Sequence, residues 1–175
     1  MKISQKNLAA QLFTCHEYTK TPKDIAETLK KVKKIGYDAV QISALGPIDP
    51  KELGAMLEGE GLFCCASHDG GDDLFNKTDA LIEKLHAVKC PYVAYPWPHT
   101  RPGTEEEWVA LAKRLDAVGA KLREAGITLC YHNHNIEFTK YNGRTALDII
   151  YSASCADNLQ GEPDTHWVQL GGANP

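Results

Sequence analysis

The sequence predicts an α/β protein of the (β/α)8-barrel type that is incomplete, with about six β/α units present. Short apolar segments alternate with amphipathic helical segments, and this alternation is typical of a parallel sheet with right-handed crossovers. Each predicted strand ends in polar or aromatic residues, as the mouth of a barrel requires, and no Gly-x-Gly-x-x-Gly follows a strand. Because a whole barrel needs about 250 residues, we expect residues 1–175 to form one partial barrel domain.

The first half of the chain contains three predicted strands. The first covers residues 8–15, and Thr21-Pro22 then begins a helix, since Thr caps helices and Pro suits the first turn. An apolar stripe runs along this helix, which ends at Gly36. The next predicted elements are a strand over 37–44, a short helix after Asp49-Pro50, a strand over 62–67 and a helix over 72–87.

The second half continues the same alternation. A strand over 92–95 leads into a stiff aromatic loop, Pro96-Trp97-Pro98-His99. Thr104 begins a capping box, and the helix that follows it continues to Glu124. The remaining predicted elements are a fifth strand that starts at Leu129, a helix over 145–154 and a sixth strand over 163–169.

Composition excludes several classes of function. The net charge is −4 and the pI is about 6.0, and no run of Lys or Arg forms a stripe, so we expect no nucleic-acid partner. No apolar segment approaches the roughly 20 residues of a membrane span, and no secretory signal begins the chain, so we expect a cytoplasmic protein without a membrane partner. The six cysteines include no Cys-x-x-Cys pair and are expected to be reduced.

The segment from Leu129 to Phe138 carries the strongest functional signal. Alternate residues of a strand point the same way, so His132 and His134 share one face, and Glu137 follows at once. Two imidazoles and a carboxylate can hold a divalent cation or move a proton. The alternative is that one histidine satisfies a hydrogen bond in the core and the rest is a polar loop.

The sequence resembles a known family at several places. These are Gln11–Thr14, Gly36–Gln41, Ser67-His68, Ala125–Ile127, Tyr131–Phe138, and Asp164-Thr165 with Trp167–Gln169; the run Tyr-His-Asn-His-x-x-Glu-Phe is the most specific. Over its whole length the chain is similar to the sugar phosphate isomerase/epimerase family, the xylose isomerase-like TIM barrels. That family also includes inosose dehydratases and apurinic endonucleases of the endonuclease IV type.

The resemblance implies a divalent metal ion, Mn²⁺, Mg²⁺ or Zn²⁺, held by two glutamates, an aspartate and a histidine. Glu137 matches the first glutamate and Asp164 the aspartate, whereas the histidine and second glutamate normally come from strands seven and eight, which are not in this sequence. The implied chemistry is isomerisation or epimerisation of a small sugar or sugar phosphate by proton transfer through an enediolate. Glu137 is then the catalytic carboxylate, with His134 orienting it or contacting the sugar.

Four other residues are candidates for substrate binding, because they lie at or near predicted strand ends: Gln41, His68, Trp97 and His132. Each has a structural alternative. Gln41 can hydrogen-bond a neighbouring strand tip, His68 can cap the next helix, and Trp97 can pack the rim. Likewise, Asp164 can be a turn residue after a proline.

Other functions also fit the sequence. A lyase of the inosose dehydratase kind would use the same site to eliminate water, and a partial barrel could lack catalysis; a metal hydrolase acting on DNA is a more distant alternative. We expect residues 1–175 alone to bind metal weakly, to be inactive, and to self-associate through free sheet edges, which makes a homo-oligomer possible.

Overall fold

The computed structural model of the protein describes residues 8–175. The chain forms two compact units, one containing residues 8–68 and 79–92, and the other containing residues 69–78 and 93–175. The strands of the main sheet follow the order β1-β2-β3-β4-β5-β8, and the pairs β1–β2, β2–β3 and β5–β8 are parallel. This is the strand–helix alternation that the sequence predicts. Within residues 8–175, no helix is both long and apolar enough to cross a membrane.

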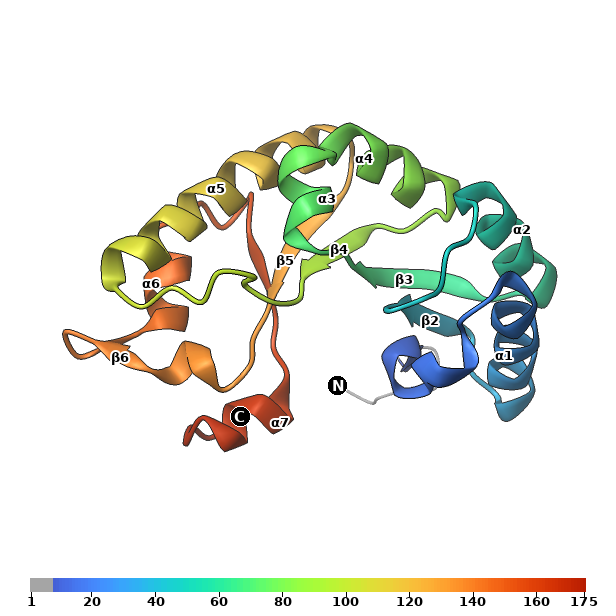
Figure 1. The fold of residues 1–175 in the computed structure, drawn as a ribbon, viewed down its shortest axis with the longest axis horizontal. Helices are drawn as coiled ribbons and strands as arrows, with labels where there is room; N and C mark the ends of the chain where they lie inside the picture. The colour runs from blue at the N-terminus through green and yellow to red at the C-terminus, as the bar shows by residue number, and fades with distance from the viewer. Residues whose placement is uncertain (1–7) are drawn as a thin grey trace. The chain divides into compact units, whose positions relative to one another are not determined.

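The first unit begins with three parallel strands and the helices that pack on them (Figure 1). Burial of Ile25, Leu29, Val40 and Leu57 builds its core. Its elements are β1 (Ala9–Gln11), the 3-10 segment η2 (Leu12–Tyr18), α1 (Pro22–Ile35), β2 (Ala39–Ile42), α2 (Pro50–Glu60), β3 (Phe63–His68) and most of α4 (Thr78–Ala87).

The prediction of a strand over 8–15 is wrong beyond Gln11, where a 3-10 segment begins. Three side chains stabilise it by bonding to the carbonyl three residues earlier: Thr14 Oγ1 to Gln11 at 2.8 Å, Cys15 Sγ to Leu12 at 3.3 Å, and His16 Nδ1 to Phe13 at 2.8 Å. Such local hydrogen bonds compete with extended structure.

The single helix predicted over 72–87 is two helices, α3 (Gly71–Asn76) and α4. Lys77 between them has φ −131° and ψ 31°, which is outside the helical region. Thr78 Oγ1 donates to the Leu74 carbonyl at 2.6 Å and so occupies an acceptor that a continuing helix would use.

The second unit is built around the long helix α5 (Glu105–Glu124), which packs on β5 (Thr128–His132) and on α6 (Ala146–Ser152) (Figure 1). The buried side chains of Trp108, Leu115 and Leu122 anchor α5 in the core. Its other elements are α3, β4 (Tyr92–Tyr95, from Val93), η3 (Ile136–Phe138), β6 (Lys140–Tyr141), β7 (Arg144–Thr145), β8 (Gln160–Glu162) and α7 (Thr165–Leu170).

Two features of this unit differ from the sequence prediction. The hairpin of β6 and β7 was not predicted; its turn residues Asn142 and Gly143 have φ of 51° and 86°, and Asn-Gly is the usual sequence of such a turn. The sixth strand, predicted over 163–169, ends at Glu162 instead. Pro163 has no backbone N–H for a sheet, and Asp164 caps helix α7 by accepting from the Trp167 N–H at 3.1 Å.

Candidate functional site

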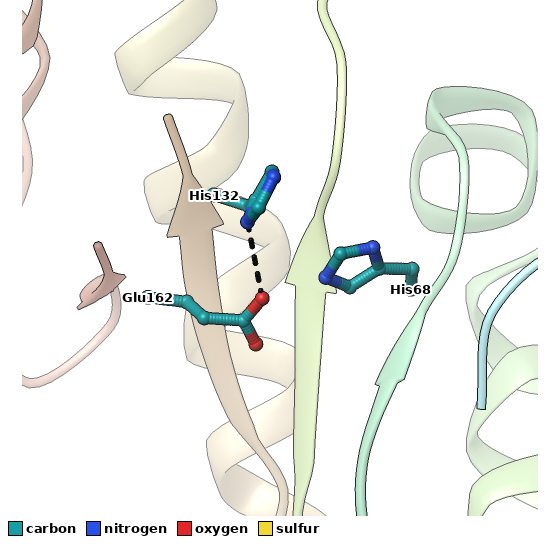
Figure 2. A group of neighbouring side chains, drawn as sticks. All are labelled: His68, His132 and Glu162. Atoms are coloured by element: carbon teal, nitrogen blue, oxygen red, sulfur yellow. Dashed lines mark ion pairs between the residues drawn. The ribbon is translucent and has the colours of Figure 1, made fainter. Parts of the chain in front are cut away.

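The centre of the candidate site is an ion pair between His132 and Glu162 (Figure 2). His132 is the last residue of β5 and Glu162 is the last residue of β8, and the parallel register sets them opposite each other. The distance from His132 Nδ1 to Glu162 Oε1 is 3.2 Å. The two side chains are 11% and 27% exposed, so the pair is sheltered but can be reached from solvent.

A second carboxylate, Asp164, lies near the other nitrogen of the same ring, with Oδ2 3.9 Å from His132 Nε2. Its backbone is held by the buried side chain of Asn133. The Asp164 N–H donates to Asn133 Oδ1 at 3.0 Å, and Asn133 Nδ2 donates to the Asp164 carbonyl at 3.4 Å. The imidazole of His132 therefore has a carboxylate at each nitrogen.

Aromatic rings border this group, and we call Trp97, His134 and Trp167 the aromatic wall. Trp97 meets His134 edge-on with ring centroids 4.7 Å apart, and Trp167 lies tilted against His134 at 5.0 Å. His134 also meets His132 edge-on at 4.9 Å. The wall thus joins the loop after β4, the loop after β5 and helix α7 at one place in the second unit.

Glu137 lies inside the protein and not at an open strand end, because the chain turns into η3 after His134. Its Oε1 accepts from the Tyr131 hydroxyl at 2.9 Å, and its Oε2 accepts from the His134 N–H at 2.7 Å. Burial raises the pKa of this carboxyl, and the two hydrogen bonds partly oppose the rise. Glu137 therefore holds the backbone that presents His134.

The raised pKa of Glu137 predicts a particular dependence of stability on pH. A carboxyl whose pKa is higher in the folded state contributes stability that is present below its unfolded pKa of about 4.3 and is lost as pH rises through the folded value. Glu137→Gln cannot ionise, so we expect the wild type to lose stability relative to this variant as pH rises from about 4. Urea-denaturation midpoints of both proteins, measured as pH rises from about 4, test this difference in stability. Parallel pH profiles for the two proteins would contradict the prediction.

The first unit holds two further residues that the sequence singled out. His68 is the last residue of β3, and its Nδ1 lies 3.5 Å from Ser43 Oγ at the end of the neighbouring strand. Gln41 is half-buried on β2, opposite Gln11 on one side and Ala66 on the other, next to a bulge in the ladder. Roles for these residues in substrate binding stay predictions.

Glu162 is the residue that reasoning from the sequence missed. The predicted strand began at Pro163, so Gln160–Glu162 was left outside it. One signal was present: Glu162 and Asp164 are two residues apart, and that spacing puts side chains on one face of an extended segment. Glu162 and Asp164 do both reach the ring of His132.

Six strands in parallel order, alternating with helices, define an α/β protein of the TIM-barrel type, as predicted. Several solved structures have the same fold, and the similarity covers nearly the whole of this chain. A sugar phosphate isomerase/epimerase from Parabacteroides distasonis ATCC 8503 has a TM-score of 0.82 at 19% identity, with 99% of this chain and 70% of that chain covered. A xylose isomerase domain containing protein from Salmonella typhimurium LT2 has a TM-score of 0.71 at 12% identity, with 98% and 65% covered.

A third similar structure is a xylose isomerase-like TIM barrel protein from Mycobacterium smegmatis in complex with magnesium, with a TM-score of 0.66, 16% identity, and 93% of this chain and 66% of that chain covered. No protein-family model and no curated protein matches the chain. At these identities the comparisons establish the fold: the chain has the fold of the xylose isomerase-like TIM barrels, with six strands present.

Two donor atoms of the site, His132 Nδ1 and a Glu162 carboxylate oxygen, lie where one divalent cation could accept both. Asp164 lies at the other nitrogen, Nε2, where a carboxylate typically orients a metal-binding histidine. Mn²⁺ and Zn²⁺ accept imidazole together with carboxylate readily, whereas Mg²⁺ prefers oxygen ligands in near-ideal octahedral geometry. These donors therefore suit a divalent cation that accepts nitrogen as well as oxygen.

Proposed function

We propose that this protein binds a divalent metal ion through His132 and Glu162, with Asp164 orienting the His132 ring at its other nitrogen, and that the site serves an isomerase or epimerase of small sugars or sugar phosphates. The observation that carries the proposal is the His132 ring with carboxylate oxygens at 3.2 Å and 3.9 Å from its two nitrogens, at the carboxyl ends of parallel strands. Active sites of TIM barrels lie at these strand ends. The similarity in fold to a sugar phosphate isomerase/epimerase supports the same kind of reaction.

The residues of the site then have distinct tasks in proton transfer next to a carbonyl. A bound divalent cation supplies Lewis-acid polarisation of the carbonyl oxygen. Glu162 accepts the proton, since its side chain is 27% exposed and its orientation is held by His132. The sequence predicted Glu137 for this task; with 0% exposure and both oxygens accepting hydrogen bonds, it suits a positioning task better.

The aromatic wall has a task in the same reaction. Trp97 and Trp167 both contact the ring of His134, and a sugar can stack its C–H face on such rings. His134 is half-buried, so it can donate to or accept from a sugar oxygen while the tryptophan rings keep water away. We propose that substrate lies against this wall with its carbonyl toward His132.

The test is solvent exchange of the substrate's α-proton. The protein is incubated with Mn²⁺ and a panel of ketoses and ketose phosphates in deuterated water, and deuterium incorporation is followed by NMR. The sequence predicted that residues 1–175 alone are inactive. For proton exchange, which needs one base only, we instead expect metal-dependent incorporation at the carbon next to the carbonyl, and loss of it in Glu162→Gln. Loss of water from the sugar would instead indicate the lyase. Exchange at equal rates with and without metal, or in Glu162→Gln, would contradict the proposal.

A further inference from the structure

A hollow of about 250 Å³ lies in the second unit between the loop after β4 and helix α5. The loop contributes Thr100, Arg101 and Pro102, and α5 contributes a stripe one or two turns apart, Glu107, Ala110, Leu111 and Arg114. Two of these side chains are arginines, whose guanidinium groups come from separate segments. Nothing in the proposed metal site uses this hollow.

Both guanidinium groups lie over aromatic rings. Arg114 Cζ is 4.0 Å from the centroid of Phe75, and Arg101 Cζ is 5.2 Å from the centroid of Trp97. Within residues 8–175, neither arginine makes a hydrogen bond or an ion pair with another side chain or with the backbone. A guanidinium on a ring keeps its planar fork of N–H donors available at the edge, and this fork matches the oxygens of a phosphate or carboxylate.

The charge balance of the hollow favours an anion with more than one negative charge. Glu107 also lines it, and this carboxylate is occupied in part, because its Oε2 accepts from the Gly103 N–H at 2.6 Å. Burial raises the pKa of the Tyr95 hydroxyl, and the positive charge of Arg114 lowers it in part, so this charge is felt at Tyr95. Two cations and one carboxylate leave a net positive charge beside several N–H donors.

We propose that this hollow is a binding site for a phosphate group, held between Arg101 and Arg114. The phosphate dianion accepts paired hydrogen bonds from guanidinium edges, and Thr100 offers a hydroxyl from the same loop. The site is separate from the metal site, but a single contact connects them, since Trp97 lies under Arg101 and meets His134. Phosphate that orders Arg101 therefore also fixes one ring of the aromatic wall.

The test is titration of the metal-free protein with inorganic phosphate at constant ionic strength, followed by the NMR signals of the Arg Nε–H groups and of the Trp97 indole. We expect saturable binding to the wild type, at least tenfold weaker binding to Arg101→Ala and Arg114→Ala, and tighter binding to Glu107→Gln, which removes the competing charge. Lys113→Ala is the matched control, because it deletes an exposed cation from the same helix outside the hollow. If Lys113→Ala weakens phosphate binding as much as Arg114→Ala does, the binding is general charge attraction, and the proposed site is overturned.

The source of the phosphate is decided by a second arm, titration with a hexose 6-phosphate in the presence of Mn²⁺. Tighter binding than inorganic phosphate, with the gain abolished by His132→Ala, means that the hollow holds the phosphate of the sugar. Equal binding of the two, still dependent on Arg114, means that free phosphate is the ligand. No saturation by either probe in the wild type would refute the proposal, and this result is independent of the metal titration that tests the proposed function.

Discussion

Replacing His132 with alanine is expected to weaken Mn²⁺ binding by about 100-fold or more, the largest functional effect that the structure predicts. The variant removes the imidazole ring whose Nδ1 lies 3.2 Å from Glu162 Oε1 and whose Nε2 lies 3.9 Å from Asp164 Oδ2. Losing a group that only orients a ligand typically costs 10–100-fold in metal affinity, so loss of a ligand at the centre of the site sets about 100-fold as the lower bound. Isothermal titration calorimetry with Mn²⁺ and Zn²⁺ measures it.

The matched control for His132→Ala is His86→Ala, which removes an exposed imidazole on α4 and should leave the affinity unchanged. A His132→Ala protein that is folded and binds Mn²⁺ as the wild type does would refute the proposed metal site.

Replacing Gly119 with alanine is expected to destabilise the protein by about 3 kcal/mol, at the upper end of what overpacking costs. Gly119 lies in the middle of α5, and a Cβ there would come 1.9 Å from the Asn158 carbonyl oxygen, so the backbone itself would have to move. The segment before β8 is bound closely to α5 here. Asp116 Oδ1 accepts from the Cys155 N–H at 2.7 Å and from Asn158 Nδ2 at 3.1 Å.

This contact also bears on function, because the segment that Gly119 touches leads directly into β8, which carries Glu162. We therefore expect Gly119→Ala to lower both the unfolding midpoint and the affinity for Mn²⁺. Gly59→Ala is the control: that glycine is helical with open space around it, so alanine should be neutral or stabilising by roughly 0.4–1 kcal/mol. Thermal and urea unfolding midpoints of both variants measure this difference in stability. A Gly119→Ala midpoint equal to that of Gly59→Ala would mean that α5 and the segment before β8 do not pack so closely.

Features that depend on neighbouring residues were predicted well from the sequence. The starts of α1, α2 and α5 follow from caps, in which Thr21, Asp49 and Thr104 accept from backbone N–H groups two or three residues ahead. Gly36 ends α1 with a φ of 114°, which glycine adopts readily. These signals act within one helical turn, so the fold class and the helix starts could be read without tertiary contacts.

Other features could not be read in this way, some of them local and some dependent on distant residues. The length of β1 and the break before α4 are decided by side chains that compete for backbone carbonyls, and apolar patterning does not report that competition. The ring contacts of His134 with Trp97 and Trp167 bring together residues more than 30 positions apart.

The candidate site divides in the same way. The sequence by itself determined that two imidazoles and a carboxylate directly follow an apolar strand in the run from His132 to Glu137, and this pattern predicted a functional site there. Only the tertiary structure decided which carboxylates accompany His132. Burial and two hydrogen bonds hold Glu137 in the core, while the parallel register of β5 with β8 sets Glu162 opposite His132. The segment that leads into β8 is held against α5 by contacts of Asp116 and Gly119 with residues 155–158, and strand patterning does not report such contacts.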